Sequence, residues 1–380
     1  MEKTAYDQSD WLAQARKERK GADPVELDWQ IGPQLSMTPH LTREESPAQA
    51  PLRLRPGWEI GTYVAAGDTA SVNAAALSEL EGGAEALLFN LHDQPDEAEI
   101  GQMLSGIQAE FVSLHCNLYY PERDPAVLFR DLIFYLRSQN YDLQKISGSV
   151  DFDPLLDWGE PPWPPLLRLL NFASKYMPNF RVLQVNGKAF NTGPQDSDTE
   201  LSLIIAKGAE YLHQLQERGV NPALANRHLQ FAVTQGTTYF VEIAKLRALR
   251  ILWANVLQGF GVEGAGVMIA SHTDPSSFGE DTNQNLLRLS TQGMAAVVGG
   301  ADLVFLRPPD APPSGVEQAT DFGRRMARNV QQLLRLEAGF DEFEDPAAGS
   351  YYLDQLTEKM ATSAWQQFLE IEAKGGFAAV

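Results

Sequence analysis

Small and polar residues alternate with apolar residues along three predicted strands, and this pattern is where binding chemistry is first expected. The strands begin near Phe111, Ile146 and Arg181. Successive side chains of a strand point to opposite faces, so each polar set shares one face. These alternating residues are Ser113, His115, Asn117, Ser147, Ser149, Asp151, Gln184 and Asn186. Parallel barrels usually fill their interior with Val, Ile and Leu, so a polar inner face indicates a bore that admits, or once admitted, a long polar ligand.

Other polar side chains fall where predicted strands end, which is where barrel enzymes build their sites. These residues are Tyr63, Asn90, His92, Asp153, Lys188, Gln235, His272 and Arg307. As the lining of the bore we predict Ser113, His115, Ser149, Asp151, Asn186, Gln235 and His272. Asp151 and Asp153 stand two apart, and such a carboxylate pair can do acid–base work. The alternative is that Asp153-Pro154 opens a loop.

Several common sites are not supported by the sequence. There is no His-Glu-x-x-His motif and the single cysteine, Cys116, has no cysteine partner, so no metal site is predicted. A Gly-x-Ser-x-Gly serine-hydrolase elbow is absent. Gly187-Lys188 is followed by alanine and lacks the upstream glycine of a phosphate-binding loop.

The elements that must position these residues are eight strand–helix units in series. The predicted strands are WEIGTYV from Trp58, ALLFNL from Ala86, FVSLHCNL from Phe111, ISGSVDF from Ile146, RVLQVNG from Arg181, LQFAVTQ from Leu229, GVMIASH from Gly266 and DLVFLRP from Asp302. Helical patterns follow, for example from Pro125, Tyr239 and Gly323. The count of eight and the lack of a Gly-rich turn after the first strand favour an α/β fold of the (β/α)8 TIM-barrel class over an open doubly wound sheet.

Three regions are predicted along the chain. Residues 1–57 form an N-terminal arm, in which a helix from Tyr6 to Gly21 precedes a proline-spaced extended stretch. Residues 58–344 form the barrel. Residues 345–380 form a C-terminal helical segment that packs on the barrel.

The composition limits the partners. Of 380 residues, 30 are Lys or Arg and 50 are Asp or Glu, so the formal net charge is −20. Nucleic acids and anionic membranes require a basic face, so neither is an expected partner. No apolar run reaches a membrane span, and the polar N-terminus is not a signal peptide. One cysteine excludes an internal disulfide, which fits a reducing compartment and a cytoplasmic location.

Three long segments resemble the barrel of the methylmalonyl-CoA mutase family. They are TTYFVEIAKLRALRILWANV from Thr237, NQNLLRLSTQGMAAVVGGADLV from Asn283, and the stretch from Arg324 to Phe377 that begins RRMARNVQQLLRLEAGF. WLAQARKERKG near Trp11 and LTREE near Leu41 are similar to the N-terminal arm of that family. The resemblance implies a (β/α)8 barrel with coenzyme A along the bore, which would explain the polar strand residues.

The sequence departs from this family at the positions that the family uses for catalysis. Where the family carries a Tyr-His pair after the fifth strand, this chain has Lys188 and Ala189. The arginine expected after the fourth strand is missing between Val150 and Pro165. Glu242 matches a family glutamate that touches the adenosyl group, so it is a candidate vestigial cofactor contact; a helix first-turn acid is the alternative.

The resemblance therefore predicts the small, non-catalytic subunit of a heterodimeric, adenosylcobalamin-dependent methylmalonyl-CoA mutase. The Asp-x-His-x-x-Gly motif that ligates cobalt is absent, so this chain is expected to bind no cofactor, and the large catalytic subunit is expected to hold adenosylcobalamin. One alternative is an active acyl-CoA mutase of altered substrate that uses Lys188, Asp151 and His272. Another is an unrelated barrel enzyme in which Lys188 forms a Schiff base.

Overall fold

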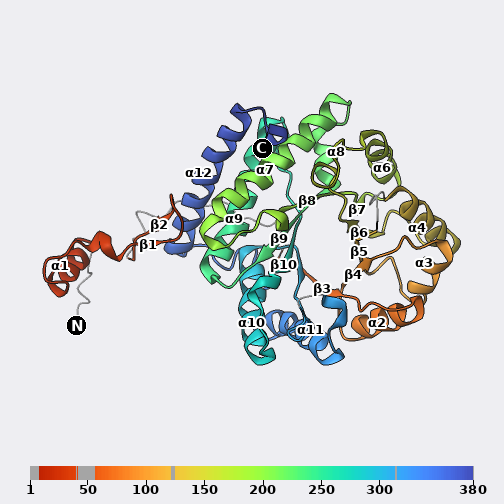
Figure 1. Ribbon diagram of the computed structural model, residues 1–380, viewed down its shortest axis with the longest axis horizontal. Coiled ribbons are helices and arrows are strands. Elements are labelled where there is room, and N and C mark those ends of the chain that lie inside the picture. The colour runs from red at the N-terminus through yellow and green to blue at the C-terminus, as the bar shows by residue number, and fades with distance from the viewer. Residues whose placement is uncertain (1–7, 40, 42–55, 121–124, 313–314, 380) are drawn as a thin grey trace.

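Eight strand positions form a closed parallel barrel in the computed structural model, which describes residues 8–39, 41, 56–120, 125–312 and 315–379 (Figure 1). The hydrogen-bonded order is β7-β6-β5-β4-β3-β11-β10-β9-β8. The strands are β3 (Glu59–Tyr63), β4 (Ala86–Leu91), β5 (Ser113–Leu118), β6 (Ser147–Val150), β7 (Asn179–Arg181), β8 (Leu183–Asn186), β9 (Leu229–Gln235), β10 (Ile269–Thr273) and β11 (Leu303–Phe305). The prediction of a (β/α)8 barrel is confirmed, and the open doubly wound sheet is wrong.

The two ends of this strand order are one interrupted strand. Only Val182 separates β7 from β8, and β7 pairs with β6 whereas β8 pairs with β9. The backbone N–H groups of Val182 and Leu183 both donate to the carbonyl of His228, at 3.0 and 3.1 Å. Val182 and Leu183 thus oppose a single residue of the neighbouring chain segment, as in a β-bulge. This bend divides the predicted strand into β7 and β8, and the ring of strands stays closed.

Helices surround the ring of strands (Figure 1). They are α2 (Thr69–Glu81), α3 (Glu97–Met103), α4 (Ala126–Ser138), α5 (Pro154–Asp157), α6 (Trp163–Tyr176), α7 (Ser197–Glu217), α8 (Pro222–Arg227), α9 (Tyr239–Gly259), α10 (Thr282–Gly299) and α11 (Asp321–Leu336). Local side chains fix several helix starts. Asp96 and Glu99 form a reciprocal capping box at α3, and Asp281 accepts two backbone N–H groups at α10. No helix in these described ranges combines the length and apolar composition needed to cross a bilayer.

An aromatic plug fills one side of the barrel interior. The Phe305 ring is 1% exposed and lies against three rings: its centroid is 5.1 Å from that of His272, 5.6 Å from that of His115 and 5.7 Å from that of Tyr63. A Cβ on Gly61 would come within 2.5 Å of the Phe305 ring, so glycine is needed where the ring crosses β3. Phe305 therefore closes the axis of the barrel at this level.

A chain of polar side chains fills the opposite side of the interior. His115 Nδ1 and the Ser149 hydroxyl are 2.8 Å apart, and the Gln230 amide donates to Ser149 at 2.7 Å and to Gln184 at 2.6 Å. Burial, with a further contribution from the Arg181 charge, lowers the pKa of His115 to about 3. His115 is therefore neutral in the folded protein.

A last long helix, α12 (Tyr351–Ala373), packs on α7 and α9 outside the barrel (Figure 1). Arg247 of α9 is fully buried and forms ion pairs with Asp345, just before α12, and with Asp354 Oδ1 at 2.9 Å. Farther along, the Ser363 hydroxyl donates to Asp198 of α7 at 2.6 Å. The C-terminal segment is thus joined to the barrel by buried polar contacts as well as by packing.

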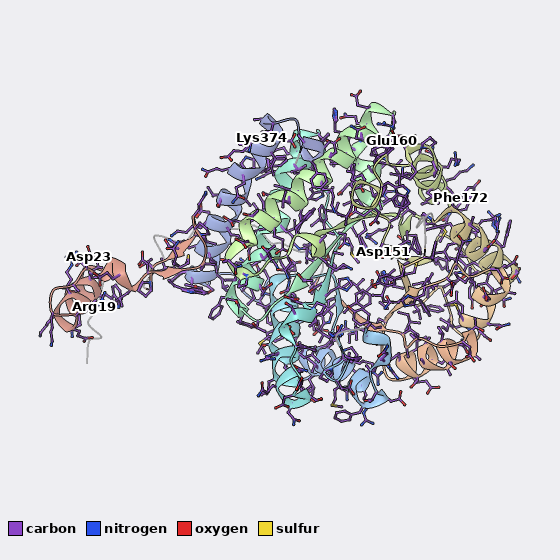
Figure 2. All side chains as sticks on the ribbon, viewed as in Figure 1. Arg19, Asp23, Asp151, Glu160, Phe172 and Lys374 are labelled. Atoms are coloured by element: carbon purple, nitrogen blue, oxygen red, sulfur yellow. The ribbon has the colours of Figure 1, made fainter. Side chains whose placement is uncertain are left out.

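The N-terminal arm has two parts. Helix α1 (Gln8–Glu18) stands away from the barrel at one end of the molecule, and Figure 2 shows Arg19 and Asp23 at the same end. After the short helix η1 (Pro24–Leu27), strands β1 (Trp29–Gln30) and β2 (Ser36–Met37) form an antiparallel hairpin.

The hairpin is a difference from the predicted extended stretch. Pro33 occupies its turn, where a fixed φ and a missing donor are tolerated, and Met37 is buried. Lys359 of α12 donates to the Ser36 carbonyl at 2.9 Å. Residues 29–37 therefore dock on the molecule's own body, whereas α1 extends beyond it. Much of the LTREE segment lies outside the described residues.

We expect His115→Gln to reduce the loss of stability in acid. The folded pKa of His115 lies below the ordinary 6.5, so as pH falls the unfolded state takes up the proton first. The stabilisation is complete above about pH 6.5 and is lost as pH falls toward 3. Between pH 7 and pH 5 the variant should lose about 2 kcal/mol less unfolding free energy than the parent.

Urea titrations at both pH values measure this difference. Equal losses in the parent and in His115→Gln would contradict a neutral buried His115.

We expect Arg247→Met to destabilise the protein by about 3–5 kcal/mol, because two buried carboxylates would lose their shared cation. Urea denaturation measures the change, and hydrogen exchange should show α12 opening most. Arg137→Met, the same change at an exposed position of α4, is the control and should leave the midpoint nearly unchanged, since Arg137 forms no ion pair with a described residue. If both variants behave alike, Arg247 does not hold the C-terminal segment.

Candidate functional site

A cavity of about 740 Å³ lies at the carboxyl ends of the strands, above the aromatic plug. It receives side chains from at least six strands or the turns that follow them. Those used below are Tyr63, Asn90, Asn117, Lys188, Thr234, His272 and Arg307. The site lies where parallel barrels place their active sites.

The floor of this cavity is formed by His272 and Tyr63. The Tyr63 hydroxyl and His272 Nδ1 are joined by a hydrogen bond of 2.9 Å, and the His272 ring stacks on Phe305. Burial first, and then the charge of Lys188, lower the pKa of His272 well below its ordinary value. His272 is therefore a neutral hydrogen-bonding group at the base of the cavity.

Lys188 enters the cavity from η3 (Gly187–Phe190), the short helix that follows β8. A Cβ on Gly187 would lie 2.5 Å from the Ile204 side chain and 3.0 Å from the Ala232 carbonyl, so glycine sets the start of this turn. Burial lowers the pKa of Lys188, and the charge of Asp151 opposes that effect. Its ammonium group makes no hydrogen bond or ion pair within 4 Å to any residue that the structure describes.

Asp151 and Asp153 do not form a carboxylate pair. Figure 2 shows Asp151 toward the inside of the ring, where its Oδ1 accepts the Leu118 N–H at 2.7 Å. Strand β6 ends at Val150, so alternation does not continue to Asp153. Asp153 is instead buried against α7, where Lys207 Nζ and the Tyr211 hydroxyl each lie 2.6 Å from its carboxylate. Asp153 is a core ion pair rather than a partner for acid–base chemistry.

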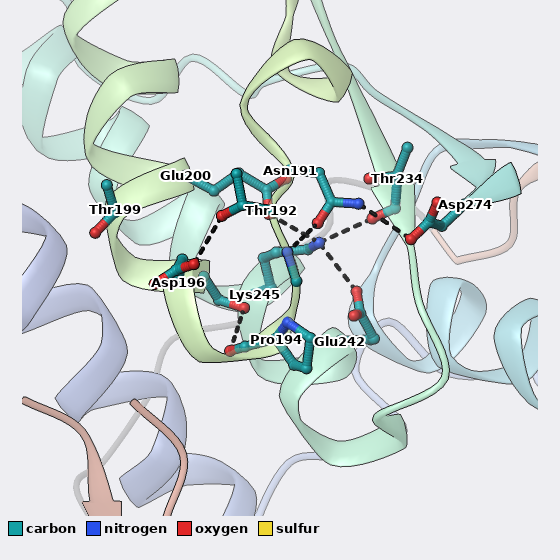
Figure 3. A network of polar contacts seen from close by, with 12 residues as sticks. Asn191, Thr192, Pro194, Asp196, Thr199, Glu200, Thr234, Glu242, Lys245 and Asp274 are labelled. Atoms are coloured by element: carbon teal, nitrogen blue, oxygen red, sulfur yellow. Dashed lines mark hydrogen bonds and ion pairs between the residues drawn. The ribbon is translucent and has the colours of Figure 1, made fainter. Parts of the chain in front are cut away.

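Glu242 belongs to a buried charge cluster at the start of α9 (Figure 3). Lys245 Nζ lies 3.0 Å from Glu242 and 3.2 Å from Glu200, and it donates to the Thr234 carbonyl at 2.9 Å. Burial, partly offset by Lys245, raises the pKa of Glu200. Glu242 is 3% exposed and is held by Lys245, so its carboxylate does not fit a contact with an adenosyl group in the mouth of the barrel.

The remaining predicted bore residues fall at different depths. Ser113 lies low in the bore, where its hydroxyl is 2.9 Å from that of Ser147. Asn186 follows Gln184 at the top of β8, and its carbonyl accepts from Lys207 at 3.2 Å. Gln235 lies on the other face of β9, toward the helices, because Thr234 faces the cavity; the Gln235 carbonyl accepts from Gln292 of α10 at 2.9 Å.

Two inward-facing residues were missing from the sequence interpretation. Thr234 lines the cavity and Gln230 links the polar chain in the bore. Counting alternate positions back from the end of LQFAVTQ could have identified both, since Gln230, Ala232 and Thr234 share one face of β9. Among the described residues, no group of three or more His, Cys, Asp or Glu side chains is arranged to hold a metal ion.

The chemistry open to this cavity is the binding of an anion. Lys188 follows β8 and Arg307 follows β11, and both bring positive charge to the cavity. Neutral polar groups come from Asn90, Asn117 and Thr234. Among the described residues that line the cavity, the one carboxylate is Asp274. It accepts from Asn191 at 3.2 Å (Figure 3) and from the Ser276 hydroxyl at 2.8 Å. Its charge is therefore partly satisfied within its own loop.

Sequence comparisons with known proteins agree on one family. A family model for methylmalonyl-CoA mutase matches residues 97–380. The methylmalonyl-CoA mutase small subunit of Porphyromonas gingivalis is 31% identical over 97% of this chain and 63% of its own length. The probable methylmalonyl-CoA mutase small subunit of Mycobacterium bovis is 35% identical over 86% of this chain and 54% of its own length. The methylmalonyl-CoA mutase large subunit of Streptomyces virginiae is 31% identical over 62% of this chain and 33% of its own length.

Among solved structures, a malate synthase magnesium/glyoxylate complex of Haloferax volcanii covers 84% of this chain at a TM-score of 0.37 and 11% identity. The chain spans about half to two thirds of the length of the small subunits it matches. The family model covers most of the sequence, and two small subunits exceed 30% identity over most of the chain. On these grounds the chain belongs to the methylmalonyl-CoA mutase family.

Proposed function

We propose that this chain serves as the small, non-catalytic subunit of a heterodimeric methylmalonyl-CoA mutase. Its role is to stabilise a large subunit that converts methylmalonyl-CoA to succinyl-CoA. The observation that carries this proposal is the match to proteins named small subunits over up to 97% of the chain. A large subunit from one organism with such a small subunit also matches, which supports a two-chain assembly.

The residues of the mouth support a non-catalytic role. Lys188 and Ala189 stand where the resemblance places a tyrosine and a histidine, and a long cationic side chain cannot replace a phenol in the same position. The aromatic plug at Phe305 supports the same view, because a thioester that threads the bore needs an open axis.

Adenosylcobalamin is assigned to the large subunit under this proposal. This assignment is supported by Glu242, the one residue that the resemblance links to the adenosyl group, because Lys245 holds it inside a buried cluster. Under this proposal, no residue of this chain takes part in the chemical steps of the reaction. A cytoplasmic location is part of the proposal and fits the single cysteine.

A second candidate is an active acyl-CoA mutase with an altered substrate. Lys188 and His272 line the same cavity, and the charge of Asp151 acts on Lys188, so these three groups do lie near one another. The third interpretation, a barrel enzyme unrelated to this family, is excluded by the family assignment.

Purified alone, the chain should show no turnover of methylmalonyl-CoA, with or without adenosylcobalamin. No cobalamin absorbance should stay with it through gel filtration. Co-expressed with a large subunit that carries the Tyr-His pair and the cobalt-ligating motif, it should form a heterodimer that is active. Turnover by the isolated chain would overturn the proposal in favour of the altered-substrate mutase.

The N-terminal arm is the part of this chain that we expect to contact the large subunit. Trp11, Leu12 and Ala15 of α1 are half-buried on a helix that stands outside the barrel. A helix of 11 residues is marginal in water unless an apolar face is covered. We infer that the large subunit packs against this helix.

Deletion of residues 1–21 should leave the barrel folded, because the hairpin at residues 29–37 remains in place. Co-purification with the large subunit should fall sharply, and Trp11→Ala should weaken the complex by about 2–4 kcal/mol. Pull-down and calorimetric titration measure these losses. The exposed polar residue Gln14 gives the matched control, Gln14→Ala. Full co-purification of the truncated chain would place the interface on the barrel helices instead.

A further inference from the structure

The cavity at the mouth of the barrel is a closed-ended site. Phe305 lies across Gly61 and contacts rings from β3, β5 and β10, so it separates the cavity from the interior below. A ligand reaches this cavity only from the carboxyl-terminal face. A ligand that must extend along the barrel axis is excluded.

Lys188 brings a positive charge into this cavity. Lys188 has no hydrogen-bond or ion-pair partner among the residues that the structure describes, although it is mostly buried. This contrasts with Lys207 and Lys245, buried lysines that each lie within 3.2 Å of a carboxylate. The carboxylate of Asp151 acts on this ammonium group without forming an ion pair within 4 Å, so an anionic ligand in the cavity could contact the ammonium group directly.

Arg307 supplies a second cation at a different side of the same cavity. It lies two residues beyond the plug residue Phe305, on the turn after β11, while Lys188 follows β8. Its guanidinium group is held in place by the carbonyls of Ala311 and Pro312. Strands β9 and β10 lie between the strands that these two residues follow, so the two cations enter the cavity from different sides.

We infer that the mouth cavity binds a short free dicarboxylate, with one carboxylate at Lys188 and the other at Arg307, and that it does not accept a coenzyme A thioester. The volume of about 740 Å³ is ample for a small organic acid. Asn90, Asn117 and Thr234 line the same cavity and provide neutral hydrogen-bonding groups for the rest of the ligand. This site goes beyond the proposed function, which assigns the isolated chain no ligand.

The test is calorimetric titration of the full-length chain with malonate, succinate and glutarate at constant ionic strength. At least one of them should bind with a Kd below about 1 mM and about tenfold more tightly than acetate, since the second carboxylate gains its own cation. Coenzyme A should not compete. No binding of any of the three up to about 10 mM would overturn the inference.

Variants connect the binding to the named cations. Lys188→Met should weaken the best dicarboxylate about tenfold while acetate binding changes less, because one charge-assisted contact is lost. Lys175→Met, an exposed lysine of α6, should bind as the parent does. Equal affinities for the dicarboxylate in parent and Lys188→Met would exclude the assignment.

The plug is tested separately. Phe305→Ala should allow coenzyme A to bind, because the ring that crosses the barrel axis is removed; if that variant does not fold, Phe305→Leu is the substitute. Continued exclusion of coenzyme A by a folded plug variant would contradict Phe305 as the barrier. These measurements need no large subunit, so their failure is distinguishable from failure of the subunit proposal.

Discussion

Closure of the parallel barrel is the constraint on which the rest of the molecule depends. An eight-stranded barrel has an interior just wide enough to be filled by side chains, so every inward-facing position must fit its neighbours. This chain meets that demand in two ways. On one side the Phe305 ring crosses Gly61 and meets Tyr63. On the other, His115, Ser149 and Gln230 form a hydrogen-bonded chain. The interior is therefore core, and the cavity begins only above it.

Buried charges outside the barrel ring join the helices to one another and to the strands. Lys207 joins α7 to Asp153 after β6, Lys245 joins α9 to Glu200 of α7, and Arg247 joins α9 to the segment before α12. Each cation has a carboxylate partner, because an unpaired buried charge is strongly destabilising. These charged groups are buried because they hold the helices and strands together. Burial of a charged residue is thus a poor guide to function in this chain, whereas a buried cation without a near partner is informative.

The sequence allowed the fold to be predicted more completely than the site. All eight strands could be recognised because short apolar runs alternate with longer helical patterns, and barrel closure followed from their number. Side-chain direction at strand ends was harder to predict. Gln235 was assigned to the bore although Thr234 faces it, and Asp153 was grouped with Asp151 although β6 ends at Val150.

Both differences have the same physical origin. Alternation holds only while the strand continues, and the residue at which a strand ends is set by tertiary contacts rather than by local pattern. The plug could not be predicted either, since it depends on an aromatic residue of the last strand meeting a glycine of the first. Nothing in the spacing of Gly61 and Phe305 along the chain indicates that pairing.

The residues that pack the core differ from the residues that face the cavity at the strand ends. This difference explains how a barrel can keep its fold while the side chains of its site change. Gly187 is fixed by Ile204 and the Ala232 carbonyl, which leave no room for a Cβ. The next side chain, Lys188, points into a cavity, where a different residue would meet no such limit. Glu242 illustrates the opposite case. Its carboxylate lies 3.0 Å from Lys245, so it has a structural reason to remain whether or not it contacts a ligand. Residues of a site that also hold the core are retained for stability, and those that only face the cavity are free to acquire new chemistry.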